Sequence, residues 1–524
     1  MMKNNLIKYS GLLVAVLCFG RCSDDVLEVA NPNQVDAQNF FQNMNDLNLA
    51  LTAVYEAQTT FELYGADFLV KGPYGLAKTA NQEFTSNNPW NQLYRNEVTP
   101  DNNLVGNFWR AFYRGVARAN DFLANTEQFL ADQELTPEEM EQANQMRGQA
   151  LYLRAFDYFH LIRLWGEKGP AVGGEAQGVP LILNVAATRE EMQTDRASVG
   201  AVYEQIINDL QEAEGLLPET WEGDDLARVD AFAVKALLGE VRMFQEDYPA
   251  AQQKFEEIIN SEQFSLVPFE EYDAMFHGEN EFSAESIFEL NLATDLQEDT
   301  WQGGTGSNLA LMIAPKGTGW SNVYPHDENI RRFGSDPRLR VCALEPGVDM
   351  VVQGDGSRDT LGIYVDDEGA LGWSFKKYVP LDESVFSTNR NYGANIIISR
   401  LADVYLLYAE ALNAQGNDVP AAEYLNKVRR RAYGLDPDAP DPTIDYIIAG
   451  TQLRDSIREE RFRELFAEGH RWYDIVRWGI VEEELARYGN VRSGEIIFNE
   501  QDYYLPIPQT ELDVNTAISQ SEGY

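Results

Sequence analysis

Cysteine is scarce: the sequence of 524 residues contains only Cys18, Cys22 and Cys342. The first two lie in a short N-terminal segment with the features of an export leader. If Cys18 leaves with the leader and Cys22 is lipid-modified, one thiol remains, which excludes an internal disulfide. Stability must then come from a buried core, and a chain of this length with 44% hydrophobic residues can supply one.

Basic residues are also few. The chain has 41 Lys and Arg against 84 Asp and Glu, a net charge of -43. Such a charge argues against nucleic acid as a partner, and against anionic glycans unless a local basic pocket overrides the overall field. It fits an exported protein of a salty habitat, where ions screen self-repulsion, and it equally fits simple solubility.

The sequence opens with an apolar run that is too short to cross a bilayer. The run covers residues 12–19 and follows Lys3 and Lys8. A basic start followed by a short apolar stretch is typical of an export signal. We therefore expect a lipoprotein signal peptide over residues 1–21.

Cys22 is the expected site of lipid modification, because a polar stretch follows it. That stretch, with Cys22 itself, gives an expected tether over residues 22–35. Arg21 is an unusual neighbour for a lipid-modified cysteine, where a small residue is expected. Cys18 is therefore the alternative.

Apolar residues recur at helical spacing in nine segments. These are residues 37–58, 102–130, 137–165, 199–217, 230–245, 250–260, 396–414, 420–432 and 452–488. They fall into antiparallel pairs of the length used by tetratricopeptide-like repeats. The predicted fold is mostly α, a stack of helix pairs with one large loop-rich insertion. Such scaffolds usually bind and seldom catalyse.

Glycine-rich stretches interrupt the helical pattern and define the expected organisation. An N-terminal helical region at 36–263 contains a ligand loop at 64–99. A loop-rich insertion follows at 264–395, and a C-terminal helical region covers 396–524. Long insertions in compact proteins are usually functional. Within this one, only short strands are expected, such as 286–290 and 373–378.

The segment 453–479 combines many Arg, Asp and Glu residues with large apolar ones. Its apolar spacing predicts a helical hairpin, with Gly469 supplying the left-handed turn that ends the first helix. The favoured interpretation is structural, since a buried arginine needs a carboxylate with which it forms paired hydrogen bonds. The alternative is an acid/base or metal cluster of Glu468, His470 and Asp474.

Here the chain resembles a known family. The segment ERFRELFAEGHRWYDIVRWG is similar to the C-terminal hallmark of SusD/RagB proteins. Other blocks resemble family patterns in the same order: FWRAFYRGVARAN (108–120), RGQALYLRAFDYFHLIRLWG (147–166), SRLADVYLLYAEALN (399–413), LNKVRRRAYG (425–434) and YYLPIPQTELDVN (503–515). One departure is the segment 167–179, inserted where the family runs quickly from LWG into Pro-Leu.

The resemblance implies a function and a location. SusD/RagB proteins are surface lipoproteins of Bacteroidota that partner outer-membrane importers. The chain is thus expected at the outer membrane and cell surface, held by a lipid anchor. It would bind an oligosaccharide or polysaccharide and deliver it to a SusC-like TonB-dependent transporter. Because some members serve peptide importers, a peptide-capturing RagB-like lipoprotein is the alternative.

The tryptophans divide into two groups. Four lie at helical apolar positions and are expected in the core: Trp109, Trp165, Trp472 and Trp478. The other four singled out lie in the loop-rich segments and are candidates to face a ligand: Trp90, Trp301, Trp320 and Trp373.

Neutral sugars suit these loop aromatics, because the C–H face of a pyranose stacks on indole while its hydroxyls need polar partners. Two clusters provide both kinds of group. The first is Trp90 with Asn88, Asn91 and Tyr94. The second is Trp320 with Asn322 and Tyr324. In the SusD/RagB family an early loop and the insertion likewise build the glycan site.

Other chemistry has weaker support in the sequence. Residues 303–306 are glycine-rich but lack the Lys-Ser/Thr of a phosphate loop. Asp366, Asp367 and Glu368 could hold a structural calcium ion or form a solvated acidic turn. A hydrolase with paired carboxylates is a third functional class, but acidic pairs are abundant here by composition alone. We therefore expect neither enzymatic activity nor a cofactor.

Overall fold

The computed structural model describes residues 40–82, 89–186, 188–293, 306–316, 318–352, 357–362, 371–379, 392–488 and 498–524. The chain divides into a short unit, Met1–Asp46, and a large one, Leu47–Tyr524. The signal peptide, Cys18, Cys22 and the tether lie outside the described residues. None of the described helices combines the length and apolar character needed to cross a membrane.

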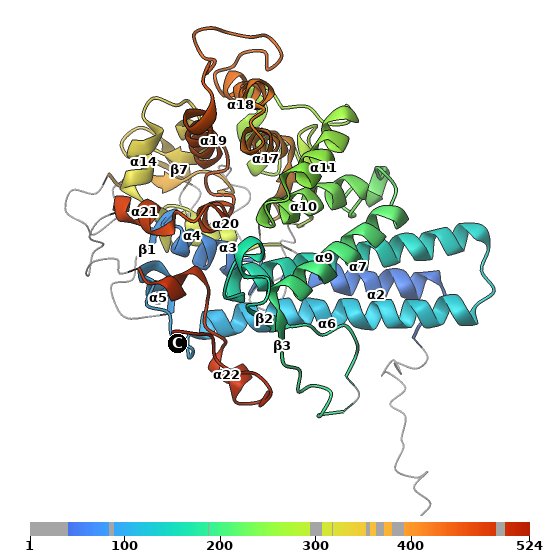
Figure 1. The fold of residues 1–524 in the computed structure, drawn as a ribbon. Helices are drawn as coiled ribbons and strands as arrows, with labels where there is room; N and C mark the ends of the chain where they lie inside the picture. The colour runs from blue at the N-terminus through green and yellow to red at the C-terminus, as the bar shows by residue number, and fades with distance from the viewer. Residues whose placement is uncertain are drawn as a thin grey trace, which may run out of the picture. The chain divides into compact units, whose positions relative to one another are not determined.

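Helices packed side by side form the scaffold of the large unit (Figure 1). They are α6 (Asn103–Asp132), α7 (Pro137–Trp165), α9 (Val199–Leu216), α10 (Ala231–Phe244), α11 (Tyr248–Asn260), α17 (Leu401–Ala414), α18 (Asp418–Ala432) and α19 (Gly450–Glu464). Each contacts a neighbour, in the order α6, α7, α9, α10, α11, α17, and α17 also contacts α18 and α19. The predicted helix-pair scaffold is therefore confirmed.

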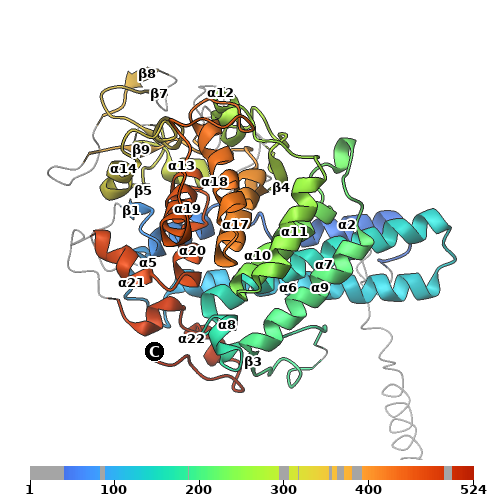
Figure 2. The same cartoon turned by 45° about the horizontal axis from the view of Figure 1, so that its top comes forward.

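The helices before and after the insertion belong to one stack. Figure 2 shows α10 and α11 beside α17 and α18, although about 140 residues separate α11 from α17. Small residues allow close approach within a pair. A Cβ on Gly239 of α10 would come within 2.4 Å of the Phe255 ring on α11.

Two of the predicted helical segments differ in the structure. Residues 396–400 form strand β10 (Ile396–Arg400), which pairs antiparallel with β4 (Ser286–Leu290). The consecutive isoleucines of β10 are β-branched and favour a strand over a helix. Residues 452–488 divide into α19, α20 (Arg471–Arg477), α21 (Val481–Leu485) and a short 3-10 turn.

Positive φ angles cause the second division. Gly469 has φ +89° but does not end the first helix as predicted, because α19 already ends at Glu464 and Gly469 lies just before α20; Gly479, with φ +67°, lies between α20 and α21. A Cβ on Gly469 would also come within 2.5 Å of Leu69 Cδ1. Glycine is thus needed at position 469 for both conformation and space.

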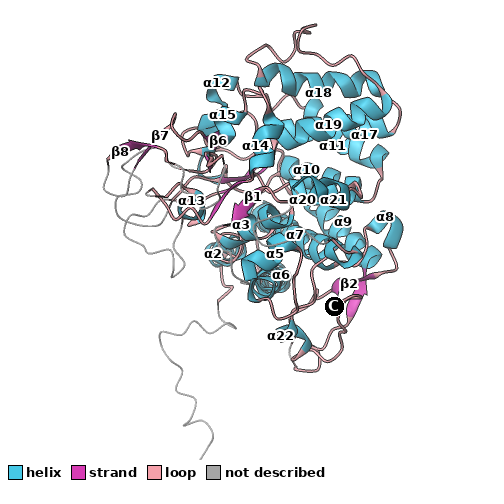
Figure 3. Ribbon diagram, turned by 90° about the vertical axis from the view of Figure 1, so that its left-hand side faces the viewer, coloured by secondary structure: helices cyan, strands magenta, loops and turns pink. Residues whose placement is uncertain are grey.

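Among the residues of the insertion that the structure describes, the strands form two-stranded antiparallel ladders beside the helix stack (Figure 3). Within it, β6 (Ala343–Leu344) pairs with β9 (Ser374–Phe375), and β7 (Met350–Val352) pairs with β8 (Arg358–Thr360). The strand expected over 373–378 is therefore only two residues long. The departure at 167–179 contains the short helix α8 (Pro170–Gly173) and the start of β2 (Gln177–Pro180).

A buried network of ion pairs joins the insertion to the helices. Arg400 lies at its centre, with Nη1 2.7 Å from both Glu285 and Glu464 and with Nε donating to Glu468 at 2.8 Å. Arg431 of α18 pairs with the same Glu285 and Glu464. All five side chains are at most 1% exposed. The charges of the hairpin 453–479 therefore act as structural pairs.

Two basic residues of the insertion also enter this network. Arg338 donates to Glu464 at 2.9 Å and to Asp336 at 2.7 Å. Lys377 donates to Glu468 at 2.7 Å. Burial alone would raise the pKa of Glu468, but Arg400 and Lys377 outweigh it and hold that pKa at about 2. The insertion is thus fastened to α19 by ionised groups.

Asp157 on α7 is a buried carboxyl with no cationic partner among the residues that the structure describes. Gln58 donates to its Oδ1 at 2.8 Å, and its Oδ2 faces Gly115 of α6, where a Cβ would come within 2.1 Å. Burial raises the pKa of Asp157 well above its usual range, although the bond from Gln58 opposes the shift. The folded state therefore favours the protonated carboxyl.

We expect Asp157→Asn to reduce the dependence of stability on pH. In the native protein, Asp157 holds a proton that the unfolded chain releases above about pH 4, so stability falls as pH rises from there toward the folded pKa. Asparagine stays neutral, and its amide can donate to Gln58 Oε1, which has no hydrogen bond within the described part of the chain. Urea unfolding at about pH 5 and pH 8 measures the difference. If the free energy of unfolding falls equally between these pH values in both proteins, Asp157 is not the protonated group.

Candidate functional site

The early loop and the insertion meet in a short antiparallel ladder. Strand β1 (Ala80–Gln82) pairs with β5 (Val323–Pro325), with Asn81 opposite Tyr324. Helices α4 (Pro73–Leu76) and α5 (Pro89–Arg95) contact β1, and α13 (Leu309–Ile313) contacts β5. Figure 2 shows these elements together at one side of the helix stack. The two segments that carry the Trp90 and Trp320 clusters are therefore neighbours.

Trp90 lies in a short helix, where the sequence predicted a loop. It follows Pro89, which favours the first turn of a helix, and the side chain is half-buried. Lys71 Nζ lies 4.0 Å from the centre of its ring and 5.9 Å from that of Phe61. This cation–π contact stabilises the position of the indole.

The buried ion pair of Lys71 and Asp67 lies under this indole, in helix α3 (Asp67–Lys71). Burial lowers the pKa of Lys71 and raises that of Asp67, while each charge opposes the shift of the other. The sequence did not predict that this pair is buried, because the same spacing of four residues is common in exposed helices.

Trp320 and Asn322 are half-buried in the tight turn between α13 and β5. Their backbone N–H groups donate to Leu311 and Met312 carbonyls, each at 2.8 Å, and Ser321 between them has φ +53°. Trp373, also half-buried, immediately precedes β9, which contacts β5. Its neighbourhood is fixed by a bond of 3.0 Å from Leu371 N–H to Asp327 on α14 (Asp327–Phe333).

The other predicted ligand residues divide into two groups. Asn91, Tyr94 and Tyr324 are buried, with 5%, 3% and 4% of their surface exposed, so they pack beneath the junction. Asn88 and Trp301 lie outside the described residues. Among the predicted residues that the structure describes, Trp90, Trp320, Asn322 and Trp373 have side chains that solvent reaches.

Lys78 also stabilises the elements around this junction, a role that the sequence did not predict. It is fully buried, and its Nζ donates to the Tyr94 carbonyl at the end of α5 and to Asn96 Oδ1 at 3.2 Å. Burial lowers its pKa to about 7, although Asp502 opposes the shift. Asn329 Nδ2 binds the Lys78 carbonyl at 2.9 Å, which connects α5 to α14.

The alternative cluster of Glu468, His470 and Asp474 is occupied by structural contacts. Asp474 accepts from Arg461 at 2.9 Å and from Arg477 at 2.8 Å. His470 Nδ1 lies 4.0 Å from Asp403. No group of three His, Cys, Asp or Glu residues in the described part of the chain is arranged to hold a metal ion. Residues 303–305 of the glycine-rich stretch and residues 366–368, the possible calcium site, fall outside that part.

A groove of about 250 Å³ lies on the exposed face of α6. It is lined by Glu62, Asn107, Arg110, Ala111 and Arg114. Both arginines belong to the block 108–120, whose aromatic residues Phe108, Trp109 and Phe112 are core residues. The sequence did not predict this groove, because Glu62 lies about 50 residues before the two arginines in the chain.

Comparison with known proteins gives consistent matches over most of the chain. Residues 284–524 match the family model described as SusD family, and residues 25–243 match one described as starch-binding associating with outer membrane. A SusD-like protein of Formosa agariphila is 25% identical, covering 99% of this chain and 98% of that protein. The starch-binding protein SusD of Bacteroides thetaiotaomicron is 24% identical over 72% of each chain.

Solved structures agree with these matches. A laminarin-binding SusD-like protein superposes with a TM-score of 0.73 and 26% identity, covering 92% of this chain and all of the other. A SusD homologue of Bacteroides thetaiotaomicron, at 21% identity, has a TM-score of 0.75 over 93% and 98% of the two chains and shows the shared fold. The chain belongs to the SusD family.

Proposed function

We propose that the protein binds an oligosaccharide at the junction of β1 and β5 and delivers it to a SusC-like TonB-dependent transporter. The observation that carries the proposal is the β1–β5 ladder, because it joins the segment of Trp90 to the segment of Trp320 and Asn322. Indole faces suit the apolar face of a sugar ring, and the Asn322 amide suits its hydroxyls.

The comparisons support a glycan as the ligand. One relative is named as binding starch, and one structural neighbour is named as binding laminarin. No contact in the described residues favours a peptide, so the RagB-like alternative has less support. Binding without turnover is the proposed activity, consistent with those names.

The proposed location is the outer membrane, facing outward, with Cys22 as the lipid-modified residue. The N-terminal apolar run and the polar tether support it, as does the family description that mentions association with the outer membrane. A lipid on Cys22 would keep the protein beside its transporter, since tethering raises the effective concentration of a partner.

Isothermal titration of the mature chain against a glycan panel tests this function. The panel contains neutral malto- and laminari-oligosaccharides, acidic oligosaccharides and a protein digest. We expect at least one oligosaccharide to bind and to be recovered uncleaved after prolonged incubation. Binding of the digest alone would replace the glycan with a peptide, and cleaved product would make the protein an enzyme.

A further inference from the structure

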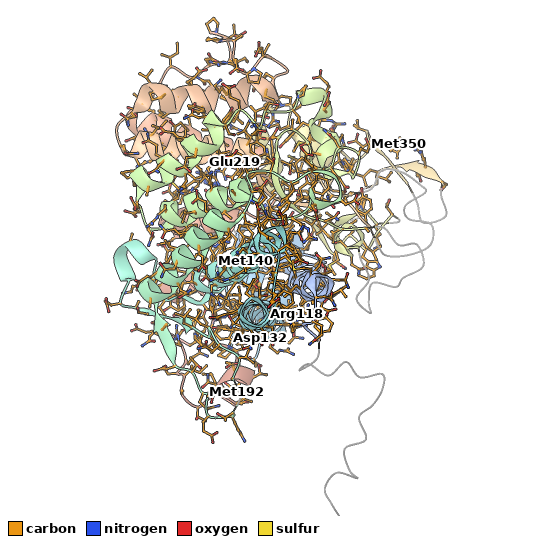
Figure 4. All side chains as sticks on the ribbon, turned by 90° about the vertical axis from the view of Figure 1, so that its right-hand side faces the viewer. Arg118, Asp132, Met140, Met192, Glu219 and Met350 are labelled. Atoms are coloured by element: carbon orange, nitrogen blue, oxygen red, sulfur yellow. The ribbon has the colours of Figure 1, made fainter. Side chains whose placement is uncertain are left out.

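The exposed face of α6 carries three arginines at intervals of four residues: Arg110, Arg114 and Arg118. Such a row is unusual in a chain with 41 basic and 84 acidic residues. Arg118, labelled in Figure 4, donates to Glu56 and to the Ala53 carbonyl, each at 2.7 Å. Arg110 and Arg114 instead line the groove of about 250 Å³.

Arg110 differs from the other charged residues of this groove in its partners. Its Nε donates to the Gly106 carbonyl at 3.3 Å and its Nη2 to Asn107 Oδ1 at 2.7 Å, and both acceptors are neutral. No carboxylate of the described residues lies within 4.0 Å of it. Arg114, in contrast, donates to Glu62 and to Thr60 Oγ1, each at 3.1 Å. The groove therefore has an excess positive charge centred on Arg110.

Helix α6 connects the groove to the segment that carries Trp90. Asn102, the N-cap of α6, donates to the Pro89 carbonyl at 3.0 Å, one residue before Trp90. Arg110 follows eight residues later, about 12 Å along the helix. On the other side, Phe61 shares Lys71 with Trp90 and directly precedes Glu62. One extended ligand could therefore contact both places.

We propose that this groove is an anion subsite, which receives a carboxylate or sulfate substituent of a glycan whose adjoining sugar lies on Trp90. The proposal rests on the glycan-binding function. Guanidinium groups bind both substituents through paired hydrogen bonds. The net charge of the chain opposes anionic ligands at long range, but salt at 0.1 M screens charges beyond about 10 Å and leaves a direct contact largely intact. Arg110 thus supplies the local basic pocket that an anionic glycan requires.

Titration of the mature chain with matched probes tests the subsite. The probes are an oligogalacturonate, the same oligosaccharide with its carboxylates reduced to alcohols, a sulfated oligosaccharide, a neutral laminari-oligosaccharide, free galacturonate and inorganic sulfate. We expect the best acidic oligosaccharide to bind about tenfold more tightly than its uncharged counterpart, and this preference to fall as salt is raised from 0.1 M toward 1 M, where the screening length shortens to about 3 Å.

Three variants locate the effect. Arg110→Gln, alone and with Arg114→Gln, should abolish the preference for the acidic probe and leave neutral binding within about twofold. Arg118→Gln is the matched control, because it removes the same charge from the same helix face outside the groove, and it should preserve the preference. Melting temperatures confirm that each variant folds.

The outcomes separate the subsite from the proposed function. If neutral glycans bind and acidic ones bind no more tightly, or if Arg110→Gln keeps the preference, the anion subsite is overturned while glycan binding stands. Free galacturonate or sulfate binding as tightly as the acidic oligosaccharide would also overturn it, because the anion site would then be independent of a glycan. Binding of no glycan at all would overturn both.

Discussion

Replacing Arg400 by methionine is expected to lower the free energy of unfolding by about 3–5 kcal/mol. The substitution leaves Glu285, Glu464 and Glu468 buried without their shared cation. Arg431, Arg338 and Lys377 still pair with these carboxylates, but the buried network loses one positive charge, and an under-compensated buried carboxylate costs far more than an exposed ion pair contributes. Urea unfolding followed by circular dichroism measures the loss.

Arg454→Met is the matched control for this prediction. Arg454 lies on α19, the helix that carries Glu464, but its pair with Asp455 is exposed on both sides. Its loss should change stability by less than about 1 kcal/mol. If Arg400→Met were no more destabilising than this control, the network would not hold the insertion to the helices.

Trp90→Ala and Trp320→Ala are each expected to weaken glycan binding by about 2 kcal/mol, which is roughly 30-fold in Kd. Each indole is half-buried, so its removal deletes the apolar face on which a sugar ring would stack. The backbone around Trp320 is fixed by two hydrogen bonds to α13, so the fold should tolerate the change.

Trp221→Ala is the control for the tryptophan variants. Trp221 is also half-buried, but it lies in the connection between α9 and α10, where its Nε1 donates to Val229 at 2.9 Å. Binding in this variant should equal that of the unsubstituted protein. An equal loss in all three variants would point to general destabilisation, and the Trp90 and Trp320 assignments would then fail.

Local signals explain what the sequence predicted well. Helix α7 has the bounds expected for it, since Thr136 and Glu139 form a capping box, Pro137 occupies the first turn and Gly166 follows the last. Strand β4 likewise has its predicted bounds. The structural interpretation of the 453–479 charges is also confirmed, because buried arginine requires carboxylates.

Interactions between distant segments explain what the sequence could not provide. The isoleucine run 396–398 suits a buried strand or a helix, and only its pairing with β4 decides between them. Tyr94 and Tyr324 are polar aromatics that could face either solvent or core, and the β1–β5 junction buries them. Arg338 and Glu464 are separated by 126 residues, so no local pattern reveals their contact.

The most direct test of the proposed site is isothermal titration of the double variant Trp90→Ala/Trp320→Ala with the glycan that binds the unsubstituted mature chain most tightly. If one ligand spans both sides of the β1–β5 junction, the double variant should show no measurable binding while its melting temperature stays close to that of the unsubstituted protein. Unchanged affinity in a folded double variant would contradict the account and place the glycan elsewhere.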